Sequence, residues 1–228
     1  MINQQTQTLL DAFTKIPLLS EHKAILIGGT ALAYHLSHRE SFDLDICFPF
    51  VDTLPELDFL DAFSEVIPLA FDQAIIDTAI NDGGDINQYM KRYIIDGVKV
   101  DFVINPSSNI YEREILRNDT KHTLGHLRIA SLSTIFTLKS LLLLDRNKIR
   151  DLYDVVYLMK ECGFTGKHFI DTIIEYRITY LPKQILQLIE AKKEDTFDIE
   201  GIEKPKMSTV EYQALKAFLI NDIIKYIK

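Results

Sequence analysis

Two aspartates, Asp43 and Asp45, are the first residues of this chain that are suited to chemistry. They are separated by one residue in the stretch FDLDICF (residues 42–48). Apolar and polar residues alternate here, which predicts a β-strand. Side chains at i and i+2 of a strand share a face and lie about 7 Å apart along the backbone. Unpaired carboxylates in a dry core would cost on the order of several kcal/mol each. This pair must therefore face water, pair with cations or hold a metal.

A third carboxylate, Asp101, lies in the stretch KVDFVI, four residues after the Asp96-Gly97 pair that predicts a hairpin turn. If its strand neighbours the strand of Asp43 and Asp45, three carboxylates converge, and such oxygen ligands suit Mg²⁺ or Mn²⁺. Two such ions about 4 Å apart can activate an attacking oxygen and stabilise a leaving phosphate oxygen. The plainer alternative is a half-exposed edge strand with its polar residues facing water.

A glycine pair precedes these aspartates: Gly28, Gly29 and Thr30 follow the apolar stretch AILI and open a stretch with helix-forming composition. Glycine lets the backbone approach a ligand closely, and the first N–H groups of a helix point at an anion, aided by the helix dipole. The turn is neither a dinucleotide fingerprint nor a Walker loop. It indicates an anion site or, more simply, a tight turn with Thr30 as the N-cap.

A lysine and two aspartates on consecutive predicted helices form a second candidate group. Lys139 lies in the apolar stretch IFTLKSLLLL, and Asp151 and Asp154 are spaced i and i+3, so they share a helix face. Arg150 is adjacent in sequence but points elsewhere on that helix. Either the Lys139 ammonium extends to the surface, or it reaches a polar cleft and meets an anion. These residues by themselves leave both interpretations open.

The elements that must position these residues change in kind along the chain. The sequence predicts a strand at 24–28, a helix from Thr30, a strand at 42–48, a helix over 55–66 and a hairpin over 89–104. Residues 106–130 are polar and are expected to be irregular, and from residue 131 onward every predicted element is a helix. We therefore expect an α/β domain with a mixed sheet (1–105), a connector (106–130) and a helical bundle (131–228).

Composition indicates a globular protein: of 228 residues, 47% are hydrophobic and 25% are charged. The net charge of −8 argues against generic nucleic-acid binding. Residues 1–105 contain 6 Lys and Arg against 16 Asp and Glu, whereas 113–150 contain 8 against 3. This asymmetry predicts a metal-binding half beside a phosphate-binding half, or simply two different amphipathic surfaces.

No apolar run is long enough for a membrane span. The two cysteines are expected to be reduced in a cytoplasmic protein.

The order of strand, Gly-Gly-Thr, helix and Asp-x-Asp resembles the nucleotidyltransferases of the DNA polymerase β superfamily. The longer stretch GGTALAYHLSHRESFDLD (28–45) is more specifically similar to the AbiEii/AbiGii-type group, the toxin component of type IV toxin–antitoxin systems. His38, Arg39 and Ser41 match its pattern ahead of the aspartates. That group also carries a helical lysine motif and then an Arg-Asp-x-x-Asp motif, where this chain has Lys139 and RDLYD (150–154).

The resemblance implies the nucleotidyltransferase fold in the N-terminal half and a role for each motif residue. The implied catalytic residues are Asp43, Asp45, Asp101 and Lys139; the implied metal ligands, for Mg²⁺ or Mn²⁺, are Asp43, Asp45 and Asp101; the implied nucleotide-binding residues are Gly28, Gly29, Thr30, Ser41, Lys139, Arg150, Asp151 and Asp154. Gly28 to Thr30 would cradle the triphosphate of an NTP, and Asp101 would help to activate the acceptor hydroxyl.

The sequence thus predicts a metal-dependent nucleotidyltransferase that moves an NMP from an NTP to an RNA, tRNA, protein or small-molecule acceptor. The resemblance adds a toxin role with an antitoxin protein as partner. The alternative is a non-catalytic nucleotide-binding or interaction protein that retains the fold. A third interpretation, a chance motif in an ordinary α/β domain, would be favoured if Asp43, Asp45 and Asp101 pointed apart.

Overall fold

The computed structural model describes residues 1–81, 84–106, 109, 111–120, 122–195 and 202–227. The chain forms two compact units. The sheet unit comprises residues 2–34 and 41–131, and the helical unit comprises residue 1, residues 35–40 and residues 132–228. The short segment 35–40 therefore belongs to the helical unit, although its neighbours in sequence on both sides belong to the sheet unit.

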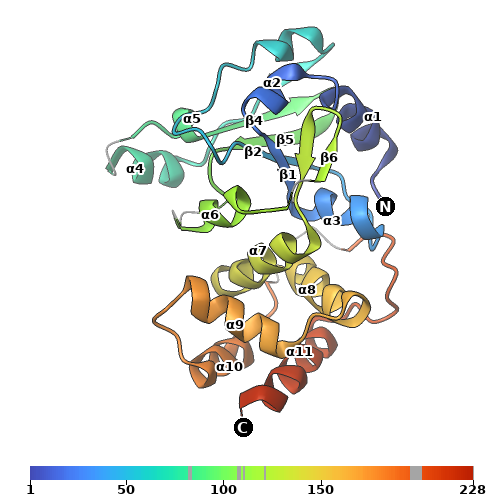
Figure 1. Cartoon of the computed structure of the whole chain (residues 1–228), viewed down its shortest axis with the longest axis vertical. Coiled ribbons are helices and arrows are strands. Elements are labelled where there is room, and N and C mark those ends of the chain that lie inside the picture. Colours follow the sequence, from blue (N-terminus) through green and yellow to red (C-terminus); the bar gives the residue numbers. More distant parts are fainter. Residues whose placement is uncertain (82–83, 107–108, 110, 121, 196–201, 228) are drawn as a thin grey trace. The chain divides into compact units, whose positions relative to one another are not determined.

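The sheet unit is built on a mixed seven-stranded sheet in the order β3-β4-β5-β2-β1-β7-β6 (Figure 1). The strands are β1 (Ile25–Ile27), β2 (Leu44–Cys47), β3 (Val66–Pro68), β4 (Met90–Ile95), β5 (Val98–Val103), β6 (His122–Leu124) and β7 (Leu127–Ile129). β2 is antiparallel to β1 and parallel to β5, and β1 is parallel to β7. The expected α/β class with a mixed sheet is confirmed.

Short helices accompany this sheet: α1 (Gln4–Phe13), α2 (Pro17–Glu21), α3 (Gly28–Leu36), the 3₁₀ helix η1 (Asp58–Ala62), α4 (Gln73–Asn81), α5 (Ile86–Tyr89) and α6 (Glu112–Arg117). The Asn3 side chain caps α1 by accepting a hydrogen bond from the Gln5 N–H at 2.9 Å. Helix α1 buries Phe13, whose ring packs against that of Phe102 on β5. This aromatic contact fixes α1 to the centre of the sheet.

The predicted hairpin is present as β4 and β5. Its two turn residues, Asp96 and Gly97, have φ angles of 46° and 79°, as a two-residue type I′ turn requires. The turn sets the antiparallel register that places Arg92 opposite Asp101. A local sequence signal thus determines which basic residue lies beside the third carboxylate.

Two expectations about secondary structure were wrong. The stretch 55–66 was expected to be a helix, but it contains only η1, and β3 begins at Val66. Its buried leucines, Leu57 and Leu60, are three residues apart. This spacing matches the three residues per turn of a 3₁₀ helix, which seldom extends beyond a few residues.

The stretch 106–130, expected to be irregular, contains α6, β6 and β7. Leu127 and Ile129 of β7 are fully buried where β7 pairs with β1. Strands of three residues are too short to show a period in the sequence, so only their pairing reveals them: β7 pairs with β1, and β6 pairs with β7. The sheet unit consequently extends to Ser131.

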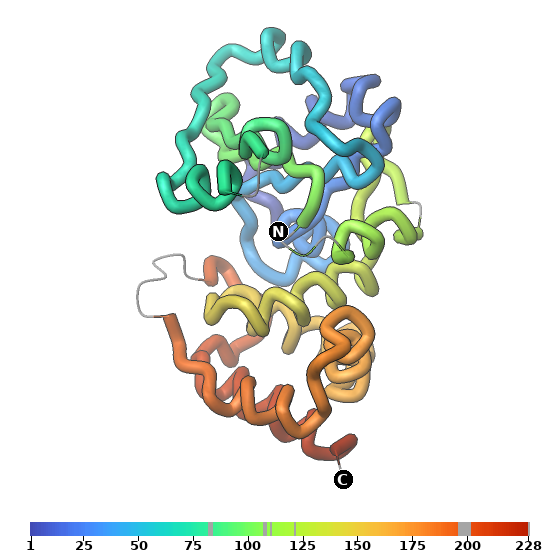
Figure 2. The backbone as a smooth tube through the Cα atoms, turned by 90° about the vertical axis from the view of Figure 1, so that its left-hand side faces the viewer, coloured from blue at the N-terminus to red at the C-terminus, as the bar shows by residue number. Residues whose placement is uncertain are grey.

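The helical unit is formed by α7 (Leu132–Asp145), α8 (Ile149–Cys162), α9 (Gly166–Tyr176), α10 (Pro182–Ala191) and α11 (Tyr212–Ile227). Helix α8 ends at Cys162, and the next residue, Gly163, has a φ of 78°, the left-handed conformation of a helix C-cap. Helix α11 packs against α8, α9 and α10, and Figure 2 shows α10 and α11 in orange and red. A Cβ on Gly166 would lie 2.5 Å from the Ile223 backbone, so glycine permits the close approach of α9 and α11.

Candidate active site

The glycine turn and the Asp-x-Asp motif meet in the sheet unit. Gly28 follows β1 directly and has a φ of 74°. Asp45 on β2 pairs with Ile27, the residue before this glycine. A Cβ at position 28 would lie 2.2 Å from Asp45 Oδ2, so only glycine leaves room for the carboxylate. The β1–β2 pairing thus brings the carboxylate against the start of α3.

Asp101 stands beside Asp45 because β2 and β5 are parallel neighbours and these two residues are register partners. Residues opposite each other in a sheet share a face, so the two carboxylates lie on the same side. Asp101 is 7% exposed. Its Oδ1 atom is buried and, among the described residues, has no hydrogen-bond partner. A buried oxygen without a partner is costly in a folded protein, and it is an atom that a cation or an acceptor hydroxyl could use.

Basic side chains hold the other oxygen of Asp101. Arg92 donates to Oδ2 from Nε at 3.3 Å and from Nη2 at 3.2 Å. The Lys99 ammonium lies 3.5 Å from the same oxygen and 4.0 Å from Asp43 Oδ2. Asp43 and Asp101 therefore already face one common cation, which is a lysine of the chain itself.

These carboxylates fit a divalent cation by their chemistry, since hard oxygen donors are what Mg²⁺ and Mn²⁺ prefer. The unpaired oxygen of Asp101 and the shared cation of Asp43 and Asp101 agree with that fit. No group of three or more His, Cys, Asp or Glu side chains in the part of the chain that the structure describes is already close enough to hold a metal. Assignment of Asp43, Asp45 and Asp101 as metal ligands stays a prediction.

Thr30 and Ser41, expected beside the phosphates, use their hydroxyls within the protein. The two hydroxyls share a hydrogen bond of 2.8 Å, and Thr30 also donates to the backbone carbonyl of Asp43. Both residues are buried. Thr30 therefore fixes the start of the Asp43–Asp45 segment to α3. Gly29 lies beside it in the first turn of that helix.

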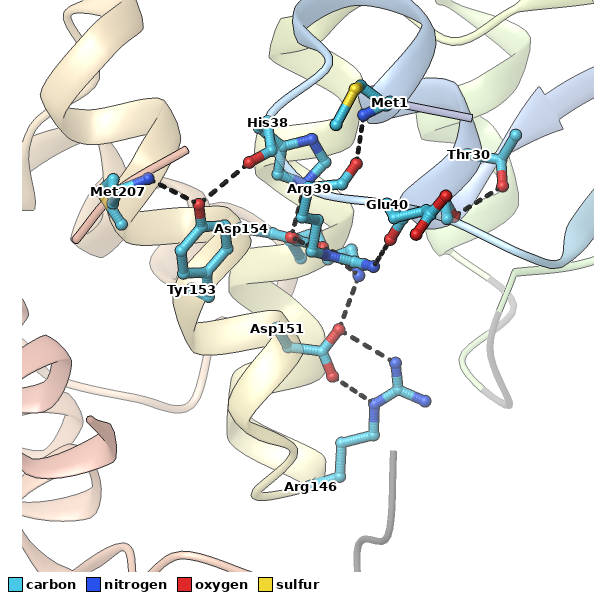
Figure 3. A network of polar contacts seen from close by, with 12 residues as sticks. Met1, Thr30, His38, Arg39, Glu40, Arg146, Asp151, Tyr153, Asp154 and Met207 are labelled. Atoms are coloured by element: carbon cyan, nitrogen blue, oxygen red, sulfur yellow. Dashed lines mark hydrogen bonds and ion pairs between the residues drawn. The ribbon is translucent and has the colours of Figure 1, made fainter. Parts of the chain in front are cut away.

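Lys139, Asp151 and Asp154 meet in the helical unit, where they form a buried ion cluster. Figure 3 shows the two aspartates of this cluster. Lys139 on α7 lies 2.7 Å from Asp151 Oδ1 and 2.9 Å from Asp154 Oδ2, both on α8. The i, i+3 spacing predicted from the sequence places both aspartates toward the lysine. Arg146 adds a two-point contact to Asp151 at 2.6 and 3.1 Å.

His38 and Arg39 complete this cluster from the segment 35–40. Arg39 donates to the two oxygens of Asp154 at 2.8 and 3.1 Å, and His38 Nε2 lies 2.8 Å from Asp154 Oδ1. The Tyr153 hydroxyl donates to the carbonyl of His38 at 3.0 Å, as Figure 3 shows. Sequence reasoning gave His38 and Arg39 no chemical role, although both belong to the motif that carries the family resemblance.

The electrostatics of the cluster follow from burial and from the matching of charges. Burial opposes the ionisation of Asp154, but the charges of Arg39 and Lys139 outweigh it and hold the pKa of this carboxyl well below its ordinary 3.8. The pKa of Asp151 is also lowered against burial, chiefly by Lys139 and Arg146. Burial lowers the pKa of His38 below 6.5, which favours its neutral form.

The predicted catalytic, metal-binding and nucleotide-binding residues thus fall into two groups. Gly28, Asp45 and Asp101 are brought together in the sheet unit. Lys139 and the two aspartates of α8 are each less than 10% exposed and are bonded to one another, while Arg150 is half-buried in the first turn of α8. The role of this second group in nucleotide binding stays a prediction.

Sequence reasoning missed Arg92 and Lys99, which hold Asp101. A signal for Arg92 was available, because residues 92 and 101 are equidistant from the turn at Asp96 and Gly97. Lys99 is at i−2 from Asp101 on the same strand, so it shares its face.

Comparison with known proteins agrees with this architecture. The crystal structure described as "putative nucleotidyltransferase from H. pylori" superposes with a TM-score of 0.51 at 16% sequence identity, covering 98% of this chain and 96% of that chain. This likeness shows that the two proteins share a fold. A search of curated proteins gave no match.

The sequence itself defines the family. The family described as "Nucleotidyl transferase AbiEii toxin, Type IV TA system" matches residues 15–223. The chain belongs to this family of nucleotidyltransferase toxins, and the resemblance inferred from its motifs is confirmed. Among the described helices, none has the length and apolar character needed to cross a membrane.

Proposed function

We propose that this protein transfers a nucleoside monophosphate from an NTP to an acceptor hydroxyl and releases pyrophosphate, with Mg²⁺ or Mn²⁺ as the cofactor. The observation that carries the proposal is the meeting of Asp45 and Asp101 on neighbouring strands, with Gly28 against Asp45 and with Asp101 Oδ1 buried and without a partner in the described part of the chain. Family membership supports the reaction class.

Each group of the sheet unit has a proposed task. The first N–H groups of α3, at Gly29 and Thr30, bind the phosphates, since a helix N-terminus next to a glycine favours an anion. The acceptor oxygen forms a bond to the α-phosphorus while the bond from the α-phosphorus to the pyrophosphate oxygen breaks. Asp101 takes the proton of the acceptor hydroxyl at Oδ1.

Asp43 and Asp45, with Asp101, would hold the divalent cation, which supplies charge neutralisation for the phosphates when it is bound. Arg92 keeps Asp101 oriented by bonding to Oδ2, the oxygen that Lys99 also faces, and it leaves Oδ1 available. Most of the rate acceleration in such a reaction comes from positioning and electrostatic stabilisation. Rigid placement on paired strands meets that requirement.

The acceptor is proposed to be RNA, with a tRNA end as the specific candidate and a cognate antitoxin protein as the opposing partner, because the family is one of type IV toxins. In the basic stretch 113–150, fewer side chains are available to bind RNA than the charge of the stretch indicates, because several are already paired or buried. Arg113 bonds to the carbonyl of Pro49, Lys139 is buried in the ion cluster, and Arg146 is paired with Asp151.

Label transfer tests both the reaction and the acceptor. The full chain is incubated with each α-³²P-labelled NTP, with Mg²⁺ or Mn²⁺, and with either total RNA, total protein or small metabolites. We expect label in the RNA fraction, no label with EDTA and none with Asp45→Asn. The matched control is Asp52→Asn, since the Asp52 side chain is 97% exposed and pairs with Arg113; it should transfer label as the parent does.

The alternative, a nucleotide-binding protein without turnover, is favoured by one observation, the pairing of Asp101 with two cations of the chain. NTP binding without label in any acceptor fraction would support it and would overturn the transferase proposal. Label in protein or in a small molecule would retain the transferase and replace the RNA acceptor.

A further inference from the structure

An apolar cleft in the sheet unit lies outside the proposed active site. It is open, has a volume of about 370 Å³ and is lined by the apolar side chains of Leu69, Phe71, Ile76, Ile80 and Ile86. Helix α4 forms one side of it, and Figure 1 shows this helix at the margin of the unit, next to α5.

Helix α4 is apolar on one side yet remains uncovered. None of its nine residues is buried, and Ile75 and Ile80 are 40% and 62% exposed. Fully burying an isoleucine stabilises by roughly 1.5–3 kcal/mol, so leaving these side chains in water forfeits stability. Exposed apolar surface with a concave shape is typical of a protein-interaction site.

The charge around the cleft selects its occupant. From Glu40 to Met90 the sequence has 12 Asp and Glu residues and not one Lys, Arg or His. Asp72, Asp77 and Asp85 are exposed beside or within the cleft. Arg92 stacks its guanidinium over the Phe71 ring at 5.7 Å, but its charge is already paired with Asp101.

We propose that this cleft binds a cationic amphipathic helix of a partner protein, with the apolar face of that helix in the cleft and its Lys and Arg residues toward the surrounding carboxylates. This inference goes beyond the proposed transferase and does not depend on it. Helix-in-groove binding uses apolar residues at i, i+3, i+4 and i+7, and complementary charge determines the choice of partner.

Other occupants fit the charges less well. Nucleic acid and anionic membranes would be repelled by the acidic run. A second copy of this chain carries the same net charge of −8. Its own cations in 113–150 are in part already paired, as Arg113, Arg117 and Arg146 show.

The proposal is tested on the full chain with isoleucine methyl labels and a synthetic helical peptide of about 18 residues, or five turns, carrying leucines on one face and lysines on the other. We expect the methyl signals of Ile76, Ile80 and Ile86 to shift on titration. Ile178 and Ile224, which are 83% and 38% exposed on the helical unit, should not shift. A peptide with glutamate in place of each lysine should not bind.

Three variants separate the cleft from general charge attraction. Ile80→Ser and Asp77→Lys should each raise the peptide Kd about tenfold, or about 1.4 kcal/mol. Asp58→Lys makes the same change of charge at an exposed residue of η1 outside the cleft, and it should leave the Kd within about threefold of the parent value.

Equal weakening by Asp58→Lys and Asp77→Lys, or equal shifts at Ile178 and Ile224, would overturn the proposal in favour of non-specific attraction. Absence of binding would overturn it outright. Analytical ultracentrifugation provides the remaining outcome: a dimer of the parent chain that Ile80→Ser dissociates would replace the partner protein by a second copy.

Discussion

The acidic site of the sheet unit and the ion cluster of the helical unit contain the same kinds of residue, but they differ in how far the carboxylates are buried and paired with cations. In the cluster, Asp151 and Asp154 are about 1% and 0% exposed, and both oxygens of each are bonded to cations. In the sheet site, the Asp43 side chain is 33% exposed, and one oxygen of Asp101 has no hydrogen-bond partner in the described part of the chain.

This difference distinguishes carboxylates that stabilise the fold from carboxylates that are available for catalysis. A carboxylate whose bonding capacity is filled by arginine and lysine stabilises its partners, and removing it leaves their charges buried. A carboxylate with an unused oxygen beside half-exposed cations can exchange them for a ligand. The same substitution, aspartate to asparagine, should therefore act on stability in one region and on activity in the other.

The largest expected effect is on the stability of the helical unit. Asp154→Asn should lower the free energy of unfolding by about 3–5 kcal/mol, because Arg39 and Lys139 stay buried without their full counter-charge. Urea denaturation measures the change. Asp171→Asn is the control, since its pair with Lys167 is exposed and should contribute less than about 1 kcal/mol. Similar losses in both variants would contradict the structural role of the cluster.

In the sheet site, Asp101→Asn should lower the turnover of labelled NTP by roughly 10²- to 10³-fold, the range for losing one strong electrostatic contact to the transition state. The free energy of unfolding of this variant should hardly change, because Arg92 and Lys99 are about one-third exposed and water can solvate their charges. Steady-state label transfer and urea denaturation are measured on the same preparation. Full turnover in this variant would remove Asp101 from the active site.

A smaller effect is expected from the lysine that faces two carboxylates. Lys99→Met should tighten Mn²⁺ binding at least about fivefold, since a unit charge about 4 Å away is worth about 1 kcal/mol even in water. Isothermal titration without nucleotide measures the affinity. Lys91→Met is the matched control, because alternation along β4 turns Lys91 to the face opposite Arg92. Unchanged or weaker binding in Lys99→Met would show that this lysine does not compete with the metal.

The smallest expected effect is a dependence of stability on pH that arises from His38. Burial lowers its pKa, so the unfolded chain binds a proton first as the pH falls through 6.5, and the free energy of unfolding declines there. The lowered pKa values of Asp151 and Asp154 add a separate decline below 3.8. Alongside Asp154, the groups facing His38 are Arg39 and Lys139.

His38→Gln should abolish the decline below pH 6.5 and keep the decline below pH 3.8. Urea denaturation at a series of pH values from neutral to acidic measures both. If the free energy of unfolding of His38→Gln still declined below pH 6.5 as in the parent, the pH dependence would be assigned to other groups.

Much of the sheet site was predictable from the sequence. Alternation in FDLDICF identified β2, and the Asp96-Gly97 turn identified the β4–β5 hairpin, because both signals depend on backbone preferences of adjacent residues. The helices after residue 131 were long enough for their periodicity to be read. The three-residue strands β6 and β7 were not, since β7 depends on pairing with β1 and β6 depends on pairing with β7.

The amino-acid order alone therefore determined the chemical groups present, the strand and hairpin that carry them, and the motif that shows the family. Only the tertiary structure decided that β5 lies beside β2, so that Asp101 meets Asp45 across a separation of 56 residues, and that Arg39 and His38 reach Asp154. The physical reason is range: turns and alternation depend on neighbouring residues, whereas contacts between distant carboxylates and cations exist only when packing brings their elements together.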